Sequence, residues 1–397
     1  MQARPPVRDW LTDFDHLDPR WIADPFPIWD EIRTRCPVAH TDRFNGVYLP
    51  TRYEDVKTVA YDTEHFSSKR IIVRDHYADN VPPAPPITSD PPEHRPARMV
   101  LLPAFTPAQI DKLEDKARAV CNMLIDRIAG ADRCDGAVDY SQHIPVRVIA
   151  HMLGVSEDDG DLFREWIELV LTAGVTDPAA LMRGVTEMTH YFVAQIAQRK
   201  AQPGDDLISF LLNTDFQGRK FDEGHVLGSL RLLLIAGIDT TWSAIGSSLW
   251  HLATHPQDRQ RLVAEPELIP TAIEEFLRAY APVTMARLVK ADTEIGGCPM
   301  KAGQMVMLSF PAANRDPAMF PDADKVIIDR QQNRHAAFGL GIHRCVGSNL
   351  ARMEMTVAVQ EWLKRMPGFS LDPSLPVEWS TGTVRGPRKL PLLLGVR

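Results

Sequence analysis

The chain has 397 residues, of which 44% are hydrophobic and 24% charged, an ordinary composition for a folded protein that buries a core. Its formal net charge of −8 argues against a nucleic-acid partner, which usually needs a basic face. The five cysteines include no C-x-x-C pair and no zinc-like spacing, which indicates a reducing compartment. Because neither a signal-peptide core nor an apolar run of roughly 18 residues is found, we expect a cytoplasmic protein that contacts no membrane.

The N-terminal half predicts short elements around one irregular stretch. Helices are expected over 26–33 and 53–60, with a strand at 47–49 between them, which is typical of an α+β edge. The stretch 70–92 is too rich in proline to be regular, and long irregular loops are often functional. Further helices are expected over 110–128, over 146–152 and, in two pieces broken near 174–178, over 163–201.

The region 225–255 predicts one long central helix, because some thirty residues pass without a proline until Pro256. At 1.5 Å per residue it would be a rod of roughly 45 Å. Its middle, 236–241, reads A-G-I-D-T-T. An acid and a hydroxyl inside an apolar helix are costly to bury without partners, so Asp239 and Thr240 are candidates for chemistry. The alternative is a kink with a satisfied threonine.

One cysteine stands in a glycine-rich loop that precedes a predicted helix over 348–363. The loop, 338–347, reads F-G-L-G-I-H-R-C-V-G. Its three glycines allow conformations that a Cβ forbids and let the backbone approach a flat ligand. The amides at the start of the helix favour the thiolate of Cys345, so we interpret Cys345 as a metal ligand rather than as a structural cysteine beside a turn.

Two charged pairs have helical spacing. His94 and Arg98 stand four residues apart, so both cationic donors could face one carboxylate, although a solvated charged face is the alternative. Glu275 and Arg278 form an acid–base pair three residues apart, which by spacing alone predicts a minor surface ion pair.

These motifs together resemble the cytochrome P450 family. The pattern F-G-x-G-x-H-x-C-x-G, continued by L-A-R at 350–352, resembles the family's haem-ligand signature. A-G-x-D-T-T resembles its oxygen-activation motif, and H-x-x-x-R resembles its propionate-binding element. The E-x-x-R pair resembles the family's buried pair, which is tied to the segment around 333–335. Gln332 departs from the pattern, since the family often has proline there.

The resemblance implies a mostly α fold with a small β region (α+β), in which residues 1–397 form a single haem domain without a fused reductase. Haem b would lie between the long helix and the ligand loop, with Cys345 as the ligand of its iron. Thr240 would hydrogen-bond the bound oxygen, and Asp239 would relay protons from solvent. The implied cofactor-binding residues are His94, Arg98, Ala236, Arg287, Phe338, Gly339, His343, Cys345 and Gly347.

The implied activity is a monooxygenase that hydroxylates or O-dealkylates a small, largely hydrophobic molecule, such as an aromatic ether, with O2. Electrons would come from a separate ferredoxin or flavodoxin with its NAD(P)H-dependent reductase, and Arg344 is a candidate docking charge. The helices within 163–201 would form a mobile lid. Arg70 and Arg74 are the only charges expected near the ligand, unless they face water. The expected substrate contacts are Leu232, Leu233, Ala236, Val283, Thr284, Met285 and Val384.

Two other functions compete with this interpretation. One is a peroxygenase driven by hydrogen peroxide, and the other is a non-catalytic haem protein that binds or senses a small ligand. Neither needs a proton relay, so the presence of Asp239 and Thr240 favours the monooxygenase.

Overall fold

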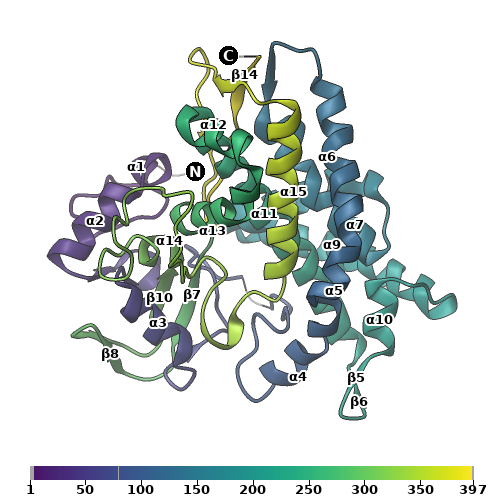
Figure 1. The fold of residues 1–397 in the computed structure, drawn as a ribbon. Coiled ribbons are helices and arrows are strands. Elements are labelled where there is room, and N and C mark those ends of the chain that lie inside the picture. The colour runs from purple at the N-terminus through teal and green to yellow at the C-terminus, as the bar shows by residue number, and fades with distance from the viewer. Residues whose placement is uncertain (1–3, 79, 396–397) are drawn as a thin grey trace.

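A β-rich part and a larger helical part lie side by side in the computed structural model, which describes residues 4–78 and 80–395, apart from the side chain at 219 (Figure 1). The β-rich part contains the N-terminal helices α1 and α2 (Pro19–Ala23 and Phe26–Arg35). Helices predominate and the sheets are small, which confirms the predicted mostly α class with a small β region.

The main sheet has five strands in the order β1-β2-β10-β7-β3, and only the β2–β10 pair is parallel. Strand β10 is buried along its whole length because both faces of the sheet are covered. Met305 and Met307 face the core under α1 and α2, whereas Val306 and Leu308 face the core under α3 (Tyr53–Tyr61) and α14 (Phe310–Ala313). The strands are β1 Val38–Thr41, β2 Val47–Pro50, β3 Phe66–Ser67, β7 Thr284–Val289 and β10 Met305–Ser309.

Four smaller sheets lie outside this one. A three-stranded sheet has the order β11-β14-β4, and the other three are two-stranded, pairing β12 with β13, β5 with β6, and β8 with β9. Their strands are β4 Arg133–Asp135, β5 Asp215–Phe216, β6 Arg219–Lys220, β8 Thr293–Ile295, β9 Cys298–Met300, β11 Phe369–Leu371, β12 Glu378–Trp379, β13 Pro387–Lys389 and β14 Pro391–Leu394.

The helical part packs around α11 (Glu223–Thr254), which α15 (Ser348–Arg365) crosses in front (Figure 1). Asp222 caps α11 by accepting a hydrogen bond from the backbone of His225 at 2.7 Å, and Pro256 opens the next helix. The other helices are α4 His94–Met99, α5 Pro107–Ile110, α6 Glu114–Ile128, α7 His143–Leu153, α8 Gly160–Ile167, α9 Pro178–Ala201, α10 Leu207–Asn213, α12 Pro256–Ala264 and α13 Ile269–Ala279.

Helix α11 is apolar nearly all round, which is typical of a helix that other elements surround. Within residues 4–78 and 80–395 it is the one helix long and apolar enough to cross a membrane. However, 72% of its most apolar window is buried inside the protein, as in the core helix of a globular fold.

Most predicted elements are confirmed to within a few residues, and one is wrong. The helix expected over 110–128 is interrupted, because α5 ends at Ile110 and a 3₁₀ turn over 111–113 precedes α6. The stretch 163–201 does contain two helices, and the break between them is a π turn followed by a 3₁₀ turn over 168–175. Within the described part of 70–92 there is no helix or strand.

A buried ion cluster centred on Glu275 joins α13 to the segment before the cysteine loop. Glu275 and Arg278 are both 0% exposed, and Arg278 donates two hydrogen bonds of 2.8 Å to the carboxylate. Arg330 and Asn333 donate to the same carboxylate at 3.0 and 3.1 Å. The surface ion pair that spacing alone predicts is therefore wrong, and the buried pair that the resemblance implies is confirmed. Arg278 is further fixed by the carbonyls of Asn314, Ala323 and Lys325.

Replacing Glu275 by Gln should strongly destabilise the fold, because it keeps the shape of the side chain but removes the charge that Arg278 and Arg330 share. Breaking a buried pair in this way costs about 3–5 kcal/mol, since cations stay buried without a counter-ion. We expect a thermal scan of Glu275→Gln to show a melting temperature lower by at least about 5 °C.

The matched control is Glu54→Gln. Glu54 pairs with Lys57 at the same i, i+3 spacing, but both side chains are exposed, so solvent replaces the lost contact and the melting temperature should not change. Equal shifts in the two variants would contradict the role given to the buried cluster.

Candidate active site

A cavity of about 1730 Å³, counting its open mouth, lies between the middle of α11 and the cysteine loop. Its walls are mostly apolar and come from segments far apart in the chain. Among them are Leu101, Phe105, Ile149, Leu277, Phe310 and Leu350.

The loop that carries Cys345 is held in a tight path. The Cys345 amide donates a 2.7 Å hydrogen bond to the Phe338 carbonyl. Gly339 and Gly341 have φ values of +71° and +69°, and a Cβ on Gly341 would lie 2.3 Å from the Ala60 carbonyl oxygen, so both positions need glycine. Gly347 was also expected to need a backbone conformation that a Cβ forbids, and this expectation is wrong, because its φ of −85° suits any residue. There a Cβ would lie 3.9 Å from the Cys345 sulfur, where its absence leaves room for a flat ligand.

The Cys345 side chain is open to the cavity although it lies deep inside the protein. Burial raises the pKa of its thiol, while the Gly347 amide and the cations Arg98, Arg344 and Arg352 act in the opposite direction. The backbone at the start of α15 thus lowers the pKa of the Cys345 thiol, as predicted, but this effect is smaller than the rise that burial causes. A positively charged metal at the sulfur would supply the remaining stabilisation of the thiolate.

A second acidic residue of α13, Glu274, supports the cysteine loop from outside. Arg352 donates to it at 2.6 and 2.8 Å and also stacks on the ring of Phe338, 4.4 Å from its centroid. His335 lies 3.1 Å from the same carboxylate. Burial raises the pKa of Glu274, but the hydrogen bonds from Arg352 and His335 outweigh it and lower the pKa to about 2. Sequence analysis missed Glu274, although Arg352 belongs to the motif that it quoted.

Three basic side chains, Arg98, Arg287 and His343, lie on the cavity wall, and the His343 ring is hydrogen-bonded to the Ser68 hydroxyl at 2.9 Å. No carboxylate in the described part of the chain forms an ion pair with either arginine, and burial lowers the pKa of Arg287 to about 10. Burial, Arg287, His94 and Arg98 together lower the pKa of His343 to about 3. His94 does not line the cavity but packs against His343 with ring centroids 4.4 Å apart, and its Nε2 is buried without a partner among the described residues. This cluster fits a ligand that carries carboxylates.

The middle of α11 presents Thr240 and small residues to the cavity and turns Asp239 away from it. Ala236, Gly237 and Thr240 line the wall, and the Thr240 hydroxyl donates to the Ala236 carbonyl at 2.9 Å. The helix is continuous here. Asp239 is 0% exposed and lies 2.8 Å from the guanidinium of Arg388, which is 20% exposed.

Arg388, which sequence analysis missed, links this buried acid to the surface. Its guanidinium also stacks over Trp242 at 4.8 Å and donates to the Ser243 hydroxyl at 3.1 Å. Burial raises the pKa of Asp239, and the nearby positive charge of Arg388 opposes the rise. The sequence contains no signal for this pair, because nearly 150 residues separate its members.

All but one of the expected substrate contacts line the cavity, namely Leu232, Leu233, Ala236, Val283, Met285 and Val384. Thr284 does not, and its prediction is wrong. Side chains alternate along an extended chain, so Val283, Met285 and Arg287 face the cavity while Thr284 points to the opposite side.

The two arginines expected near the ligand do not line the cavity either. Arg74 is buried and donates to the carbonyls of Gly174 and Val170, so it ties the irregular loop to the break between α8 and α9. Arg70 is exposed and stacks on the ring of Tyr77, 4.5 Å from its centroid. The loop instead places apolar side chains on the cavity wall, which are Ile71, Ile72, Pro86 and Ile87.

Several known proteins that are similar to this chain in sequence and in fold belong to one family. The cytochrome P450 family model matches residues 161–375. The chain is 34% identical to mycinamicin IV hydroxylase/epoxidase of Micromonospora griseorubida over 87% of this chain and 89% of that protein. It is 33% identical to steroid C26-monooxygenase of Mycolicibacterium smegmatis, over 88% of each.

Solved structures agree with the sequence comparison. CYP109Q5 from Chondromyces apiculatus superposes with a TM-score of 0.88 at 32% identity, over 98% of this chain and 100% of that one. CYP109E1 from Bacillus megaterium, solved in complex with testosterone, superposes with a TM-score of 0.87 at 31% identity, over 94% and 99%.

These likenesses extend over nearly the whole chain, and the cavity fits the family's cofactor. One cysteine opens into it, glycine replaces bulk beside the sulfur, and two arginines that form no ion pair with a described carboxylate line its wall, which suits a cofactor with two propionates. The chain therefore belongs to the cytochrome P450 family, and it is a monooxygenase that binds haem b.

Proposed function

We propose that this cytochrome P450 inserts one oxygen atom from O2 into a small, largely hydrophobic molecule by hydroxylation or O-dealkylation. The observation that carries the proposal is that Cys345 and Thr240 both face one mostly apolar cavity. Haem whose iron is bound by a cysteine thiolate supplies the cleavage of dioxygen. The residues of the chain then bind the cofactor, position the substrate and handle protons.

In this proposal Cys345 is the iron ligand and the cation cluster holds the propionates. Arg98, Arg287 and His343 line the cavity and bind the carboxylates directly, and His94 supports His343. Arg98 and Arg287 form no ion pair with a carboxylate of the described chain, which supports this role, because a cation inside a protein is costly without a counter-ion. The faces of the ring contact the remaining cofactor-binding residues, which are Ala236, Phe338, Gly339 and Gly347.

Asp239 and Thr240 move protons between solvent and the cavity. Asp239 is sealed from solvent, and the partly exposed Arg388 is its route outward. Because burial raises the pKa of Asp239, this carboxyl binds a proton more readily than an exposed aspartate does. The Thr240 hydroxyl, which now donates to Ala236, can turn its proton into the cavity. A peroxygenase or a haem sensor has no need for this buried pair, so the pair favours the monooxygenase.

The apolar wall suits the substrate class. Leu232, Leu233, Val283, Met285 and Val384 offer the substrate no charge. A mostly apolar pocket orients its ligand with few polar contacts, so a neutral aromatic molecule such as an aryl ether fits it best.

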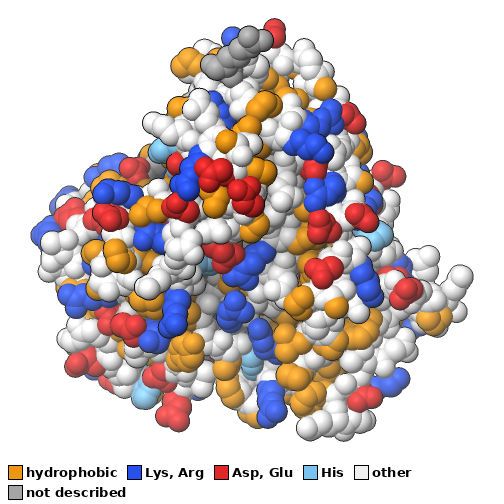
Figure 2. Space-filling model, in the orientation of Figure 1, with side chains coloured by type: hydrophobic (Ala, Val, Ile, Leu, Met, Phe, Trp, Pro, Cys, Tyr) orange, Lys and Arg blue, Asp and Glu red, His pale blue; other side chains and the backbone are white. Residues whose placement is uncertain are grey.

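Electrons come from a separate ferredoxin or flavodoxin with its NAD(P)H-dependent reductase. Figure 2 shows Lys and Arg side chains gathered around the hollow where the loop before α15 lies, and Arg334 and Arg344 of this segment are exposed. An acidic partner protein would be steered to such a face. All five cysteines are unpaired, which suits the cytoplasm as the compartment.

The reduced protein with carbon monoxide should show the strongly red-shifted Soret band of thiolate ligation. Cys345→His should replace it with a histidine-type band, because the axial ligand changes. The control variant is Cys298→Ser, which alters a cysteine of strand β9 outside the cavity and should keep the shifted band. A histidine-type spectrum from the folded unmodified protein would contradict the role of Cys345.

Replacing Thr240 by Ala should divert electrons from product to hydrogen peroxide, because the cavity loses its proton-donating hydroxyl. Product formed per NADH should fall at least about 10-fold, a lower bound beneath the roughly 100- to 10,000-fold that a positioned proton-transfer group contributes to a rate. The measurement compares product and peroxide per NADH with a surrogate redox partner. Thr241→Ala is the control, since Thr241 lies next to Thr240 on the same wall. Unchanged coupling in Thr240→Ala would make the threonine structural.

Substrate class can be read from the shift of the haem from low to high spin. Neutral aromatics should bind more tightly than aromatic acids or long fatty acids, and Val283→Phe should weaken their binding by narrowing the cavity. Thr284→Val changes the neighbouring residue, which faces away, and should leave binding unchanged. Tight binding confined to fatty acids or to bulky polyketides would contradict the proposed substrate class.

A further inference from the structure

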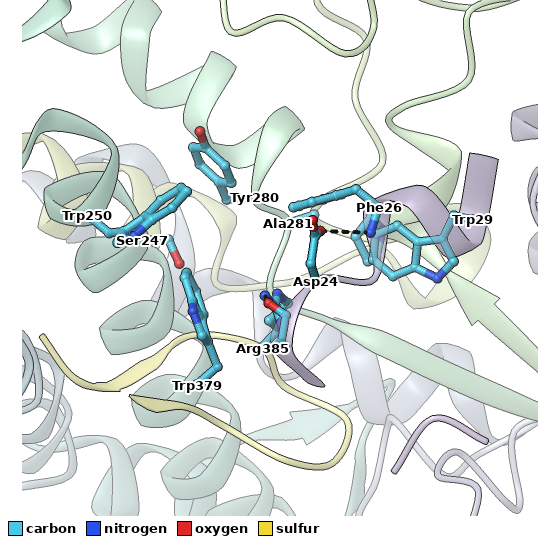
Figure 3. A pocket seen from close by; sticks show the side chains of 11 residues that line it. Asp24, Phe26, Trp29, Ser247, Trp250, Tyr280, Ala281, Trp379 and Arg385 are labelled. Carbon is cyan, nitrogen blue, oxygen red and sulfur yellow. Dashed lines mark hydrogen bonds between the residues drawn. The ribbon is translucent and has the colours of Figure 1, made fainter. Parts of the chain in front are cut away.

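A second cavity, of about 670 Å³ including its mouth, lies on the other side of the wall formed by residues 282–285 and 383–384 (Figure 3). It is bounded by the junction of α1 and α2, the last turns of α11, the end of α13 and the turn between β12 and β13. It shares no lining residue with the haem cavity among those described.

Aromatic rings form two opposite sides of this cavity. Figure 3 shows Trp250 and Trp379 on one side, Phe26 and Trp29 on the other, and Tyr280 above them. Trp250 meets Trp379 at 5.4 Å and Tyr280 at 5.6 Å between ring centroids, both nearly edge to face. Edge-to-face contacts fix the rings, so the space between the two sides suits a flat aromatic ligand.

The Ser247 hydroxyl points into this space without a partner. Ser247 is 2% exposed and lies one turn before Trp250 on α11. Its oxygen makes no hydrogen bond to the residues that the structure describes, and Figure 3 shows it directed between Trp250 and Trp379. Because Ser247 lines the cavity, a ligand atom inside it can hydrogen-bond to this hydroxyl.

Arg385 lies at the bottom of the cavity with most of its donors unused. Its guanidinium has five N–H groups, and it donates to the carbonyls of Ile22 and Ala23. No carboxylate of the described chain comes within ion-pair distance, and it stacks on Trp379 at 4.4 Å. Burial lowers the pKa of Arg385 to about 10, and the charge of Asp24 opposes this only in part.

Arg385 is the charged group on the cavity wall that a ligand could neutralise. Asp24, the acid of the lining, is exposed and accepts a hydrogen bond from the Phe26 amide at 3.2 Å. Arg315 stacks on the Phe26 ring, 3.8 Å from its centre, but it does not line the cavity and donates to the carbonyls of Ala279 and Asp324. A ligand anion would therefore stabilise the guanidinium of Arg385.

We propose that this cavity is a second binding site, separate from the haem, for an aromatic carboxylate. The ring lies between the two aromatic sides, the carboxylate accepts hydrogen bonds from Arg385, and the Ser247 hydroxyl supplies a further contact. Planar guanidinium and carboxylate groups can pair through two parallel hydrogen bonds, which gives the site its preference for this anion. This proposal does not rest on the substrate class proposed for the haem cavity.

Occupation of this site would act on the haem cavity through their common wall. The Arg385 amide donates to the Pro282 carbonyl at 2.7 Å, and the neighbouring residues Val283 and Val384 form a β-bridge that lines the haem cavity. The test must therefore keep the haem cavity filled, so that binding at the second site is measured by itself.

The experiment titrates the haem-loaded protein with 2-naphthoate by calorimetry while 4-phenylimidazole, an azole that ligates iron, saturates the haem cavity. We expect one naphthoate per chain, bound at least about 10-fold more tightly than the neutral analogue 2-acetylnaphthalene. Arg385→Gln should weaken naphthoate about 10-fold or more, which corresponds to about 1.4 kcal/mol. Ser247→Phe should abolish binding by filling the space. Arg127→Gln, an exposed arginine on α6, should have no effect.

Both site variants should keep the carbon monoxide band and the affinity for 4-phenylimidazole, which shows that they fold and retain haem. The proposal is overturned if naphthoate fails to bind once the azole fills the haem cavity, or if Ser247→Phe binds it normally. It is also overturned if the neutral analogue binds as tightly as the acid, because Arg385 would then have no part in recognition.

Discussion

The burial of positive charge without a protein partner is the constraint on which this structure depends. Arg98, Arg287 and His343 stand on the wall of an otherwise apolar cavity. Burial lowers the pKa of Arg287 to about 10, against the charge of Asp90, and burial together with the nearby Arg287, His94 and Arg98 lowers the pKa of His343 to about 3. A protein interior does not hold such a group stably by itself. In the role proposed for these residues, the two carboxylates of haem would supply the missing partners and its apolar ring would fill the cavity. Binding of haem and stability of the fold would then be coupled.

The position of Cys345, the proposed iron ligand, depends on two adjacent acids of α13. Glu275 turns into the protein and binds Arg330 and Asn333, and Glu274 turns the other way and binds His335 and Arg352. The first three of these partners precede the cysteine loop, and Arg352 follows it on α15. Both ends of the loop are thus fastened to one turn of one helix. The loop between them needs only its left-handed glycines and the bond from the Cys345 amide to Phe338 to place the sulfur.

Local patterns predicted much of the fold, and motifs predicted most of the site. The long helix, the ligand loop and the irregular stretch before α4 could be predicted from the sequence. Proline, glycine and apolar runs determine the backbone structure of the residues next to them. The prediction that Thr284 contacts the substrate was wrong, because its position on the strand, rather than its residue type, decides which way its side chain points. The prediction that Arg74 lies near the ligand was wrong, because its hydrogen-bond partners, the carbonyls of Gly174 and Val170, belong to a turn about 100 residues further along the chain. Arg388 has no local signal at all, since its role comes from tertiary contact with Asp239.

One face of α11 serves both cavities, and residue size along it decides what each cavity can hold. Ala236, Gly237 and Thr240 leave space beside the haem cavity, and Ala244 continues the same wall. About one turn further on, Ser247 and Trp250 belong to the second cavity, where a small residue again leaves space and an indole bounds it. From Ala236 to Trp250 the helix rises roughly 21 Å at 1.5 Å per residue, so the two spaces are neighbours along one rigid element. A helix that is buried nearly all round cannot shift at one of them without moving the wall of the other.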